Sequence, residues 1–163
     1  ACQQGRLECV RLLLEAGAAV NQANKGGTTP LSAASLTGKV ECARLLLEAG
    51  AVVSQADYEG CTPLYGACQN GHFECARMLR DAGADINQAM NDGCTPLFIA
   101  CQKGHLEIVR LLLEASAAIN QAKWHDATPL FAACHFGHLD VAKLLSSYGA
   151  SRAATRFGTP GEA

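Results

Sequence analysis

The sequence predicts an all-α repeat protein, in which a helix-turn-helix unit with a hairpin-like loop is copied along the chain and stacked into a solenoid. Two observations support this prediction. The tripeptide Thr-Pro-Leu recurs, each copy thirty-three residues after the last, at Thr29, Thr62, Thr95 and Thr128. In the same register, one column holds only alanine and another only glycine: Ala1, Ala34, Ala67, Ala100 and Ala133, and Gly5, Gly38, Gly71, Gly104 and Gly137. A fixed period of this length indicates a unit that buries its apolar face only against neighbouring copies.

The first helix of each unit is expected to begin at the Thr-Pro-Leu motif. The threonine hydroxyl can accept a hydrogen bond from the first helical turn, and proline follows at the one helical position where a missing N–H costs nothing. The helix should end near the glycine of the repeat, because a residue without Cβ readily adopts the left-handed conformation that turns the chain.

A second helix is predicted over the leucine-rich segment, for which residues 11–15, Arg-Leu-Leu-Leu-Glu, are the pattern. It should end at a further column of glycines, namely Gly17, Gly50, Gly83 and Gly149. An extended stretch follows, as in residues 18–23, and leads to a turn closed by Gly27, Gly60 or Gly93. Each unit therefore reads as helix, turn, helix and hairpin-like loop.

These motifs resemble the ankyrin repeat over nearly the whole chain. The pattern is Gly-x-Thr-Pro-Leu, followed by Ala, Gly-His-x-Glu, Leu-Leu-Leu-Glu-Ala-Gly-Ala and Asn at matching offsets. The resemblance implies L-shaped repeats in a curved solenoid whose hairpin tips and inner helices usually bind another protein. Two columns depart from it. The usual histidine after Thr-Pro-Leu is replaced by Ser32, Tyr65, Phe98 and Phe131. Ser116 and Asp126 stand where glycine is expected, and a left-handed conformation there would cost roughly 1 kcal/mol more.

The expected organisation is four full repeats preceded by a partial one. The predicted units are a partial N-terminal repeat at 1–24, repeats at 25–57, 58–90 and 91–123, a C-terminal repeat at 124–156 and a tail at 157–163. The N-terminal repeat presents Leu7, Cys9 and Leu12 without a polar cap, which predicts self-association through this end or a longer parent protein.

Composition predicts a soluble intracellular module, cytoplasmic or nuclear. The net charge is −2, from 13 basic and 15 acidic residues, so nucleic acid and anionic membranes are not expected partners. No apolar run approaches the roughly twenty residues that span a bilayer. Glutamates that precede arginines by three residues, as in Glu41 and Arg44, predict solvated ion pairs on the second helices. Glutamates that follow arginines by four residues extend the pattern, namely Glu15, Glu48 and Glu114.

The nine cysteines follow the repeat columns and are predicted to be small, buried, reduced residues. Packed helices lie ~8 to 10 Å apart, whereas a disulfide needs Cα atoms within about 7 Å, so equivalent cysteines should not be bridged. Cys61 and Cys94, next to the hairpin turns, are expected to react first with thiol reagents. Zinc binding and redox sensing are the alternatives, but no Cys-x-x-Cys occurs.

Neither a metal, a cofactor nor an enzymatic activity is predicted. Cys134, His135 and His138 form the only local Cys/His cluster, and His138 belongs to the repeat column of His72 and His105. No Gly-rich phosphate loop or nucleophile elbow is present. His125 beside Asp126 could serve as a base and its orienting group, but an exposed loop pair is the simpler interpretation.

The columns that differ most between repeats are the predicted binding surface for another protein. They lie before Thr-Pro-Leu and at the end of the first helix. Alanine on the first helices and leucine on the second should close the stack on the first-helix side, so these columns would line a concave face and its hairpin rim. The candidate residues are Tyr58, Glu59, Gln69, Asn70, Asn91, Asp92, Gln102, Lys103, Trp124, His125, His135 and Phe136.

Trp124, Phe136 and Tyr58 are the expected anchors, because aromatic side chains dominate protein interfaces. Tyr65, Phe98 and Phe131 share one repeat column and are expected to pack between repeats. Two alternative functions are an engineered binder and a spacer segment of a longer repeat protein. Irregular positions such as Arg80 argue against a consensus design.

One modification follows from the resemblance. Asn21, Asn87 and Asn120 occupy the hairpin position at which ankyrin repeats resemble substrates of an asparagine hydroxylase, and Asn87 has the best context, after Asp85-Ile86. The alternative is that these side chains satisfy backbone groups of the loops.

Overall fold

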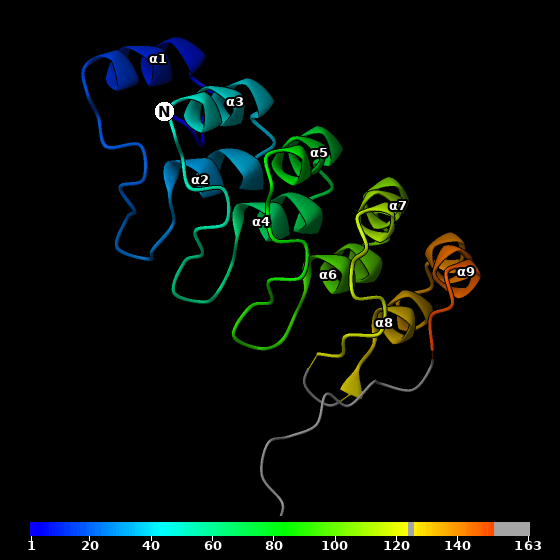
Figure 1. Cartoon of the computed structure of the whole chain (residues 1–163). Helices are drawn as coiled ribbons and strands as arrows, with labels where there is room; N and C mark the ends of the chain where they lie inside the picture. The colour runs from blue at the N-terminus through cyan, green and yellow to red at the C-terminus, as the bar shows by residue number, and fades with distance from the viewer. Residues whose placement is uncertain (124–125, 152–163) are drawn as a thin grey trace, which may run out of the picture.

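A computed structural model describes residues 1–123 and 126–151, and the regular secondary structure in these ranges is helical apart from one isolated bridge (Figure 1). The helices are α1 (Leu7–Glu15), α2 (Pro30–Leu36), α3 (Val40–Glu48), α4 (Pro63–Gln69), α5 (Phe73–Asp81), α6 (Pro96–Lys103), α7 (Leu106–Glu114), α8 (Pro129–His135) and α9 (Leu139–Ser147). An isolated antiparallel bridge joins Lys123 to Ala127.

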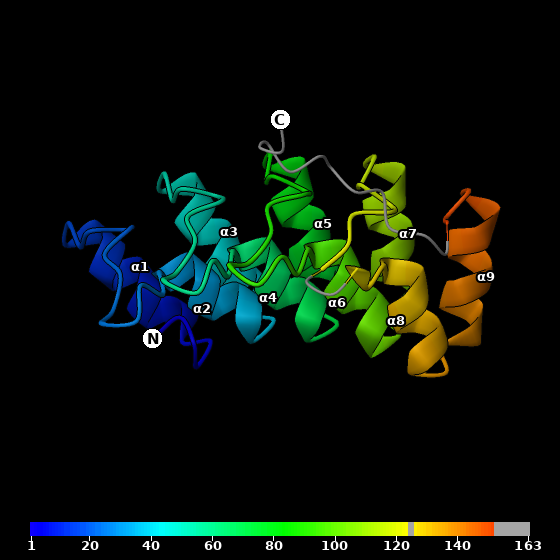
Figure 2. The same cartoon turned by 90° about the horizontal axis from the view of Figure 1, so that it is seen from below.

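The helices form two stacked layers, which Figure 2 shows from below. The first helices α2, α4, α6 and α8 make one layer, and the second helices α1, α3, α5, α7 and α9 make the other. First helices contact each other more extensively than second helices do. Closer packing on one side bends a stack toward that side, as the small alanines of the first helices predicted. We call the first-helix side, with its hairpin tips, the inner surface.

The Thr-Pro-Leu motifs start the first helices as predicted. In α2, α4, α6 and α8 the threonine hydroxyl accepts the backbone N–H of the third helical residue, and proline is the first helical residue. The bonds from Ser32, Tyr65, Phe98 and Phe131 are each 3.1 Å long. All four threonines are buried, so this cap is also the partner that a buried hydroxyl requires.

The turns that end the helices and those that close the hairpin loops have a left-handed backbone residue. Glycines fill most of these positions, but Ser116 (φ 61°) and Asp126 (φ 58°) adopt the same conformation with side chains present. The expectation that these two positions are left-handed is therefore confirmed. Each costs roughly 1 kcal/mol relative to glycine.

In three of the repeats a histidine ties the helix-turn-helix unit to the one before it. His72, His105 and His138 place Nε2 at 3.2, 3.3 and 3.0 Å from the carbonyl oxygens of residues 36, 69 and 102. A carbonyl can only accept, so Nε2 carries the proton in each ring. The imidazole lies against the glycine of the preceding turn: a Cβ on Gly104 would come within 2.4 Å of His138 Nδ1.

The hairpin loops are joined by a second ladder of hydrogen bonds. Asn21, Asn87 and Asn120 each accept, through Oδ1, a backbone N–H from the next loop at 2.8 Å, and Ser54 accepts one at 3.0 Å. The loops are thereby held in register with their neighbours. These contacts support the structural interpretation of the asparagine column.

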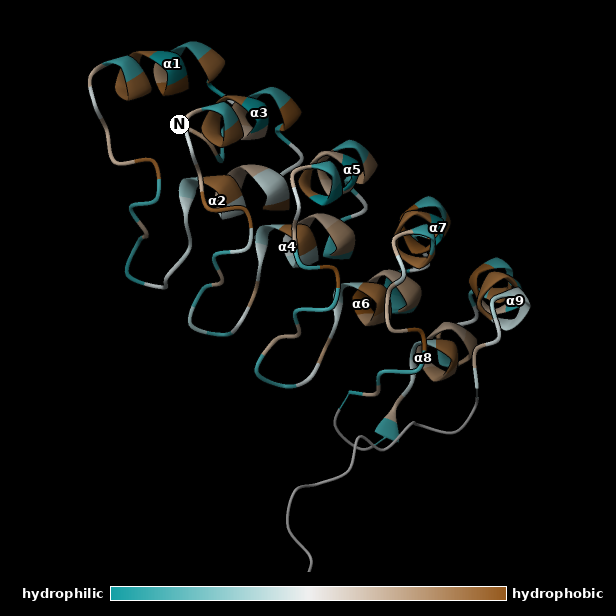
Figure 3. Cartoon of the chain, in the orientation of Figure 1, coloured by the Kyte–Doolittle hydropathy of each residue, from teal (hydrophilic) through white to brown (hydrophobic). Residues whose placement is uncertain are grey.

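The apolar core runs between the two layers, where Figure 3 shows hydrophobic residues facing one another. Its largest fully buried side chains come mainly from two leucine columns: Leu31, Leu64 and Leu97, and Leu46, Leu79, Leu112 and Leu145. Burial of one such leucine contributes about 1.5–3 kcal/mol. Ser35 stands in the cysteine column of Cys68 and Cys101, and its buried hydroxyl has no hydrogen-bond partner among the described residues.

The cysteine prediction is correct for the interior and wrong at both ends of the stack. All nine thiols are free. Burial raises the pKa of Cys68 and Cys101, while the pKa of Cys61 rises to about 11 because of burial and of nearby Asp57. Cys9 and Cys134, however, are exposed.

Two further expectations about the same columns are corrected. Cys94 is buried, so it is not among the thiols most accessible to reagents. Tyr65 and Phe98 pack between repeats as predicted, but Phe131 is 56% exposed, because no further repeat among the described residues covers it.

Candidate protein-binding surface

The hairpin tips form one connected edge of the inner surface. Tyr58 N–H donates to the carbonyl of Gly26 at 3.4 Å, and the N–H of Asn91 donates to the carbonyl of Glu59 at 2.9 Å. The Asn91 side chain adds a bond from Nδ2 to the carbonyl of Tyr58 at 2.9 Å. Backbone and side chain together therefore fix the tips at Gly26, Tyr58 and Asn91 to one another.

Carboxylate and amide side chains shape the tips themselves. Asp57 Oδ1 accepts the N–H groups of Glu59 and Cys61 at 3.0 and 2.9 Å, and Asn24 makes the equivalent pair one repeat earlier. The ring of Tyr58 is held on this frame but is 75% exposed. Its side chain is a projecting aromatic group on a tip whose backbone is held by hydrogen bonds.

Asp92 is engaged within the protein and does not project freely from its tip. Its Oδ2 lies 2.6 Å from Lys123 Nζ, and its Oδ1 accepts the N–H of Cys94 at 2.9 Å. Partial burial opposes ionisation, but the bonds from Lys123 and Cys94 lower the pKa of the Asp92 carboxyl overall. The hydrogen bond to Asp92 in turn raises the pKa of Lys123, whose ammonium lies 5.9 Å from the ring centroid of Phe98.

The ends of the first helices line an open groove of about 500 Å³. Its lining residues are Leu36, Gln69, Asn70, Lys103 and His105. Asn70 donates from Nδ2 to the carbonyl of Gly66 at 3.0 Å, which satisfies the end of α4. Lys103 is exposed and forms no ion pair with the described residues. The groove thus combines an apolar side chain, amides and one available positive charge.

Three aromatic rings gather at the end of α8. Phe131 and His135 stack with centroids 5.6 Å apart and an interplanar angle of 15°. Phe136 meets the edge of His135 at 4.9 Å and is half exposed. His135 and Phe136 thus form an aromatic cluster with Phe131 at the C-terminal end of α8.

The predicted residues fall into three groups, at the tips, in the groove and at the end of α8. Gln102 lies beside the groove and is half-buried, with its carbonyl bonded to His138. Trp124 and His125 lie outside the described residues. Sequence reasoning did not include His105 and Lys123 in this surface. Leu36 lies in the variable column at the end of the first helix, and its exposure is the available signal for the groove.

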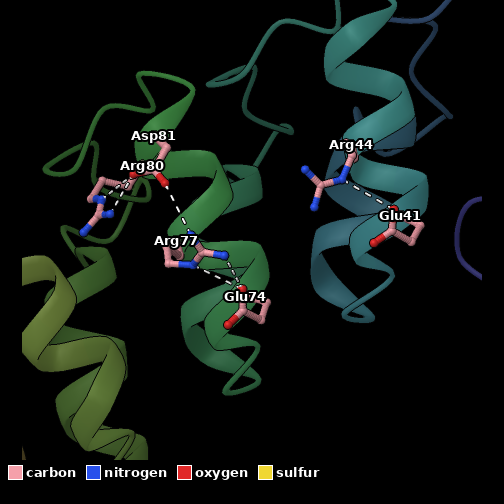
Figure 4. Close-up of polar contacts among 6 residues, drawn as sticks. All are labelled: Glu41, Arg44, Glu74, Arg77, Arg80 and Asp81. Atoms are coloured by element: carbon pink, nitrogen blue, oxygen red, sulfur yellow. Dashed lines mark hydrogen bonds and ion pairs between the residues drawn. The ribbon is translucent and has the colours of Figure 1, made fainter.

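The opposite face carries the predicted ion pairs, two of which appear in Figure 4. Glu41 and Arg44 lie 3.4 Å apart, and Glu74 and Arg77 lie 2.7 Å apart; the pairs in α1 and α7 are 3.8 Å long. Arg77 also reaches Asp81 at 3.9 Å. Of the predicted partners four residues after arginine, Glu15, Glu48 and Glu114 make no ion pair in the described part of the chain. These exposed pairs contribute little to stability.

The described residues contain neither a metal-binding cluster nor a helix that could span a membrane. Across residues 1–123 and 126–151, no three histidine, cysteine or acidic side chains are grouped so that they could hold a metal ion. Within the same ranges, no helix has the length and apolar character needed to cross a membrane.

The fold and its surface are those of an ankyrin repeat array, and sequence comparison agrees. A family model described as ankyrin repeats (3 copies) matches residues 1–90 and 87–155. The chain therefore belongs to the ankyrin repeat family. Proteins of this family are generally protein-protein interaction modules and typically lack catalytic activity. A search of curated proteins gives no match to the chain.

Proposed function

We propose that the chain is a protein-binding module with no chemistry of its own, and that its partner contacts the hairpin tips and the groove of the inner surface. One observation carries this proposal: Tyr58, the most exposed aromatic side chain among the described residues, projects from a tip whose backbone is held on both sides by hydrogen bonds. A fixed backbone means that little conformational freedom is lost on binding. Tyrosine is also a residue type enriched at interface hot spots.

The groove complements this anchor. Leu36 offers an apolar contact, while Gln69, Asn70 and Lys103 offer polar ones. An interface with an apolar centre and a polar rim has this distribution. Trp124, His125, His135 and Phe136 extend the proposed surface toward the C-terminus, and Glu59, Asn91, Asp92 and Gln102 border it.

The proposed compartment is the cytoplasm or nucleus, with another protein as partner and no nucleic acid or membrane ligand. Nine free thiols fit a reducing environment. The near-neutral charge offers no strong attraction to a polyanion.

Affinity capture from a cell lysate tests the proposal. Three baits are compared: the parent chain, a Tyr58→Ala, Phe136→Ala double variant, and an Arg11→Ala, Arg44→Ala double variant as the control on the opposite face. A partner of the inner surface should be lost with the first variant and kept with the second. Equal loss with both variants refutes the inner surface as the binding site. Proteins kept by both variants bind outside the inner surface, and a parent chain that captures no protein indicates a spacer scaffold instead.

A second interaction, self-association through the N-terminal repeat, is favoured by its exposed apolar residues. Leu12 and Leu13 are more than half exposed on α1, and Cys9 is exposed beside them. Exposed apolar groups at one end of a repeat array favour association.

A further inference from the structure

Acidic residues are absent from the first helices and from the turns that follow them. None of the 15 aspartates and glutamates lies in residues 1–6, 29–39, 62–72, 95–105 or 128–138. The lysines and arginines of the same segments are Arg6, Lys39 and Lys103. The turn edge of the inner surface, where the first helices end, therefore carries positive charge and no carboxylate.

Lys103 stands in a column whose members in α2 and α4 are tied to their own helix. Thr37 donates from Oγ1 to the carbonyl of Ala33 at 2.8 Å, and Asn70 donates from Nδ2 to the carbonyl of Gly66 at 3.0 Å. The exposed Lys103 side chain forms neither a hydrogen bond nor an ion pair with residues 1–123 and 126–151. Its ammonium group is available to a ligand.

Lys39 occupies the turn column in which the later repeats have histidine. His72, His105 and His138 each bond a carbonyl of the preceding repeat. The stem of Lys39 lies against the preceding turn in the same way, since a Cβ on Gly5 would come within 2.9 Å of its Cδ. Its ammonium group, however, has no hydrogen bond or ion pair in the described part of the chain.

The carboxylates that follow these turns are engaged on the second helices. Each lies within ion-pair distance of an arginine of its own helix, at 3.4, 2.7 and 3.8 Å for Glu41 and Arg44, Glu74 and Arg77, and Glu107 and Arg110. These carboxylates are therefore matched locally, and the charges of the two lysines are left for a partner.

The groove lies between the two lysines. Leu36 and Lys103 line it from different repeats, with the amides of Gln69 and Asn70 between them. Lys39 follows Leu36 by three residues, and its stem points to the preceding repeat, beyond the Leu36 end of the groove. The order along the stack is thus a positive charge, an apolar side chain, amides and a second positive charge.

We propose that the groove binds an acidic, extended segment of the partner protein, with carboxylates at Lys39 and Lys103 and an aliphatic side chain on Leu36. This inference rests on the proposed function and specifies the chemistry of the partner. Glu59 is exposed at a hairpin tip, at the opposite end of the first helices, so the acidic segment belongs at the turn edge. Complementary charge would orient the segment and speed its association.

The spacing of the repeats sets the length of the segment. Packed helices lie ~8–10 Å apart, so the two repeat steps from Lys39 to Lys103 span about 16–20 Å. An extended chain covers ~3.3 Å per residue, which places the two carboxylates about five or six residues apart. The aliphatic side chain should lie between them, nearer to the carboxylate at Lys39.

Selection from a displayed library of random peptides, each about twelve residues long, tests this chemistry because it exceeds the expected span. Peptides enriched on the parent chain should carry an excess of aspartate and glutamate over lysine and arginine. Enriched peptides without this excess, or the absence of any enriched peptide, overturn the inference.

Charge reversal then locates the site. Lys39→Glu, Lys103→Glu should bind the enriched peptides at least about tenfold more weakly by fluorescence anisotropy, and the difference should shrink as salt is raised. Arg44→Glu, Arg110→Glu is the matched control, since it changes the net charge equally on the opposite face. Equal loss with both double variants refutes the groove as the acidic site.

The apolar contact has its own pair of variants. Leu36→Ala should weaken binding about fivefold or more, whereas Val52→Ala, which shortens an exposed aliphatic side chain on the loop after α3, should leave it unchanged. Equal affinities of the two variants remove Leu36 from the site. Circular dichroism confirms folding, and Lys103→Glu alone replaces the double variant if that variant does not fold.

Two further outcomes separate this inference from its alternatives. A thymidylate oligonucleotide that binds as tightly as the enriched peptides, through the same lysines, would show a general polyanion site and overturn the peptide assignment. Neutral or basic enriched peptides that are lost with Tyr58→Ala, Phe136→Ala would refute the acidic segment and leave the proposed function standing. The proposed function fails separately, if that double variant still captures the partner from a lysate.

Discussion

Replacing Gly104 with alanine should destabilise the fold by more than the backbone conformation alone requires. Gly104 has φ +74°, and a Cβ there would lie 2.4 Å from Nδ1 of His138. The imidazole would have to move, and its 3.0 Å hydrogen bond to the carbonyl of Gln102 would be lost. The left-handed backbone costs alanine roughly 1–2 kcal/mol. Loss of the hydrogen bond adds about 0.5–1.5 kcal/mol, for a total of about 1.5–3.5 kcal/mol.

Gly83 is the matched control for the steric part of this argument. It has φ +84°, but a Cβ there would meet nothing within 4 Å. Gly83→Ala should therefore cost only the backbone part, about 1–2 kcal/mol. Urea denaturation followed by circular dichroism gives the free energies of unfolding for both variants and for the parent.

A double-mutant cycle identifies the histidine as the cause. In a His138→Ala background the Cβ has no ring to displace, so Gly104→Ala should cost no more than Gly83→Ala does in the parent. The reasoning is refuted if Gly104→Ala and Gly83→Ala are equally destabilising in the parent. It is also refuted if removal of His138 leaves the cost at Gly104 unchanged.

Four further predictions concern individual side chains. When the native protein is treated with a thiol reagent, peptide mapping should find Cys9 and Cys134 modified first and Cys68 unmodified, because burial both covers the Cys68 thiol and raises its pKa. Early labelling of Cys68 would contradict the packing. Ser35→Ala should raise the free energy of unfolding by about 1 kcal/mol, since it removes a buried hydroxyl without a partner, and a destabilised variant would show that the hydroxyl is satisfied. The pKa of the Asp92 carboxyl is lowered in the folded state, so its contribution to folding stability is complete above about pH 4 and is lost as pH falls through the folded pKa. Asp92→Asn should therefore make the free energy of unfolding fall less steeply in acid. An unchanged acid profile would refute the role of the ion pair with Lys123. Intact-mass analysis after incubation with an asparagine hydroxylase decides between the two interpretations of Asn87: an added oxygen shows that it is a substrate, and an unchanged mass leaves the bond from Ala118 as its role.

The helices and turns could be predicted from the sequence because their causes are local. The Thr62 hydroxyl caps α4 by accepting the backbone N–H of Tyr65, three residues later. Pro63 fits the first helical position of α4 whatever the rest of the chain does. Ser116 could be assigned a left-handed backbone because the repeat register identifies its position. Recurrence of the pattern then implies stacking, since one unit cannot bury its own leucines.

The binding surface was only partly predictable. The exposure of Tyr58 could be predicted from its place at a variable hairpin tip. The ion pair between Asp92 and Lys123 could not be predicted, because it joins two loops that are distant in sequence and adjacent only after the repeats stack. The bonds from His105 to the carbonyl of Gln69 likewise depend on how far one repeat is rotated against the next.

The sequence by itself determined the repeat, its helices, its caps and its family, because each of these depends on residues that are close together in one unit. The tertiary structure decided which copy of a column is covered. Phe98 and Phe131 occupy the same column, each directly after a Thr-Pro-Leu motif, yet one is buried and the other is exposed. Cys101 and Cys134 differ in the same way. Burial is a property of the neighbouring repeat, and only stacking determines whether a column is core or surface.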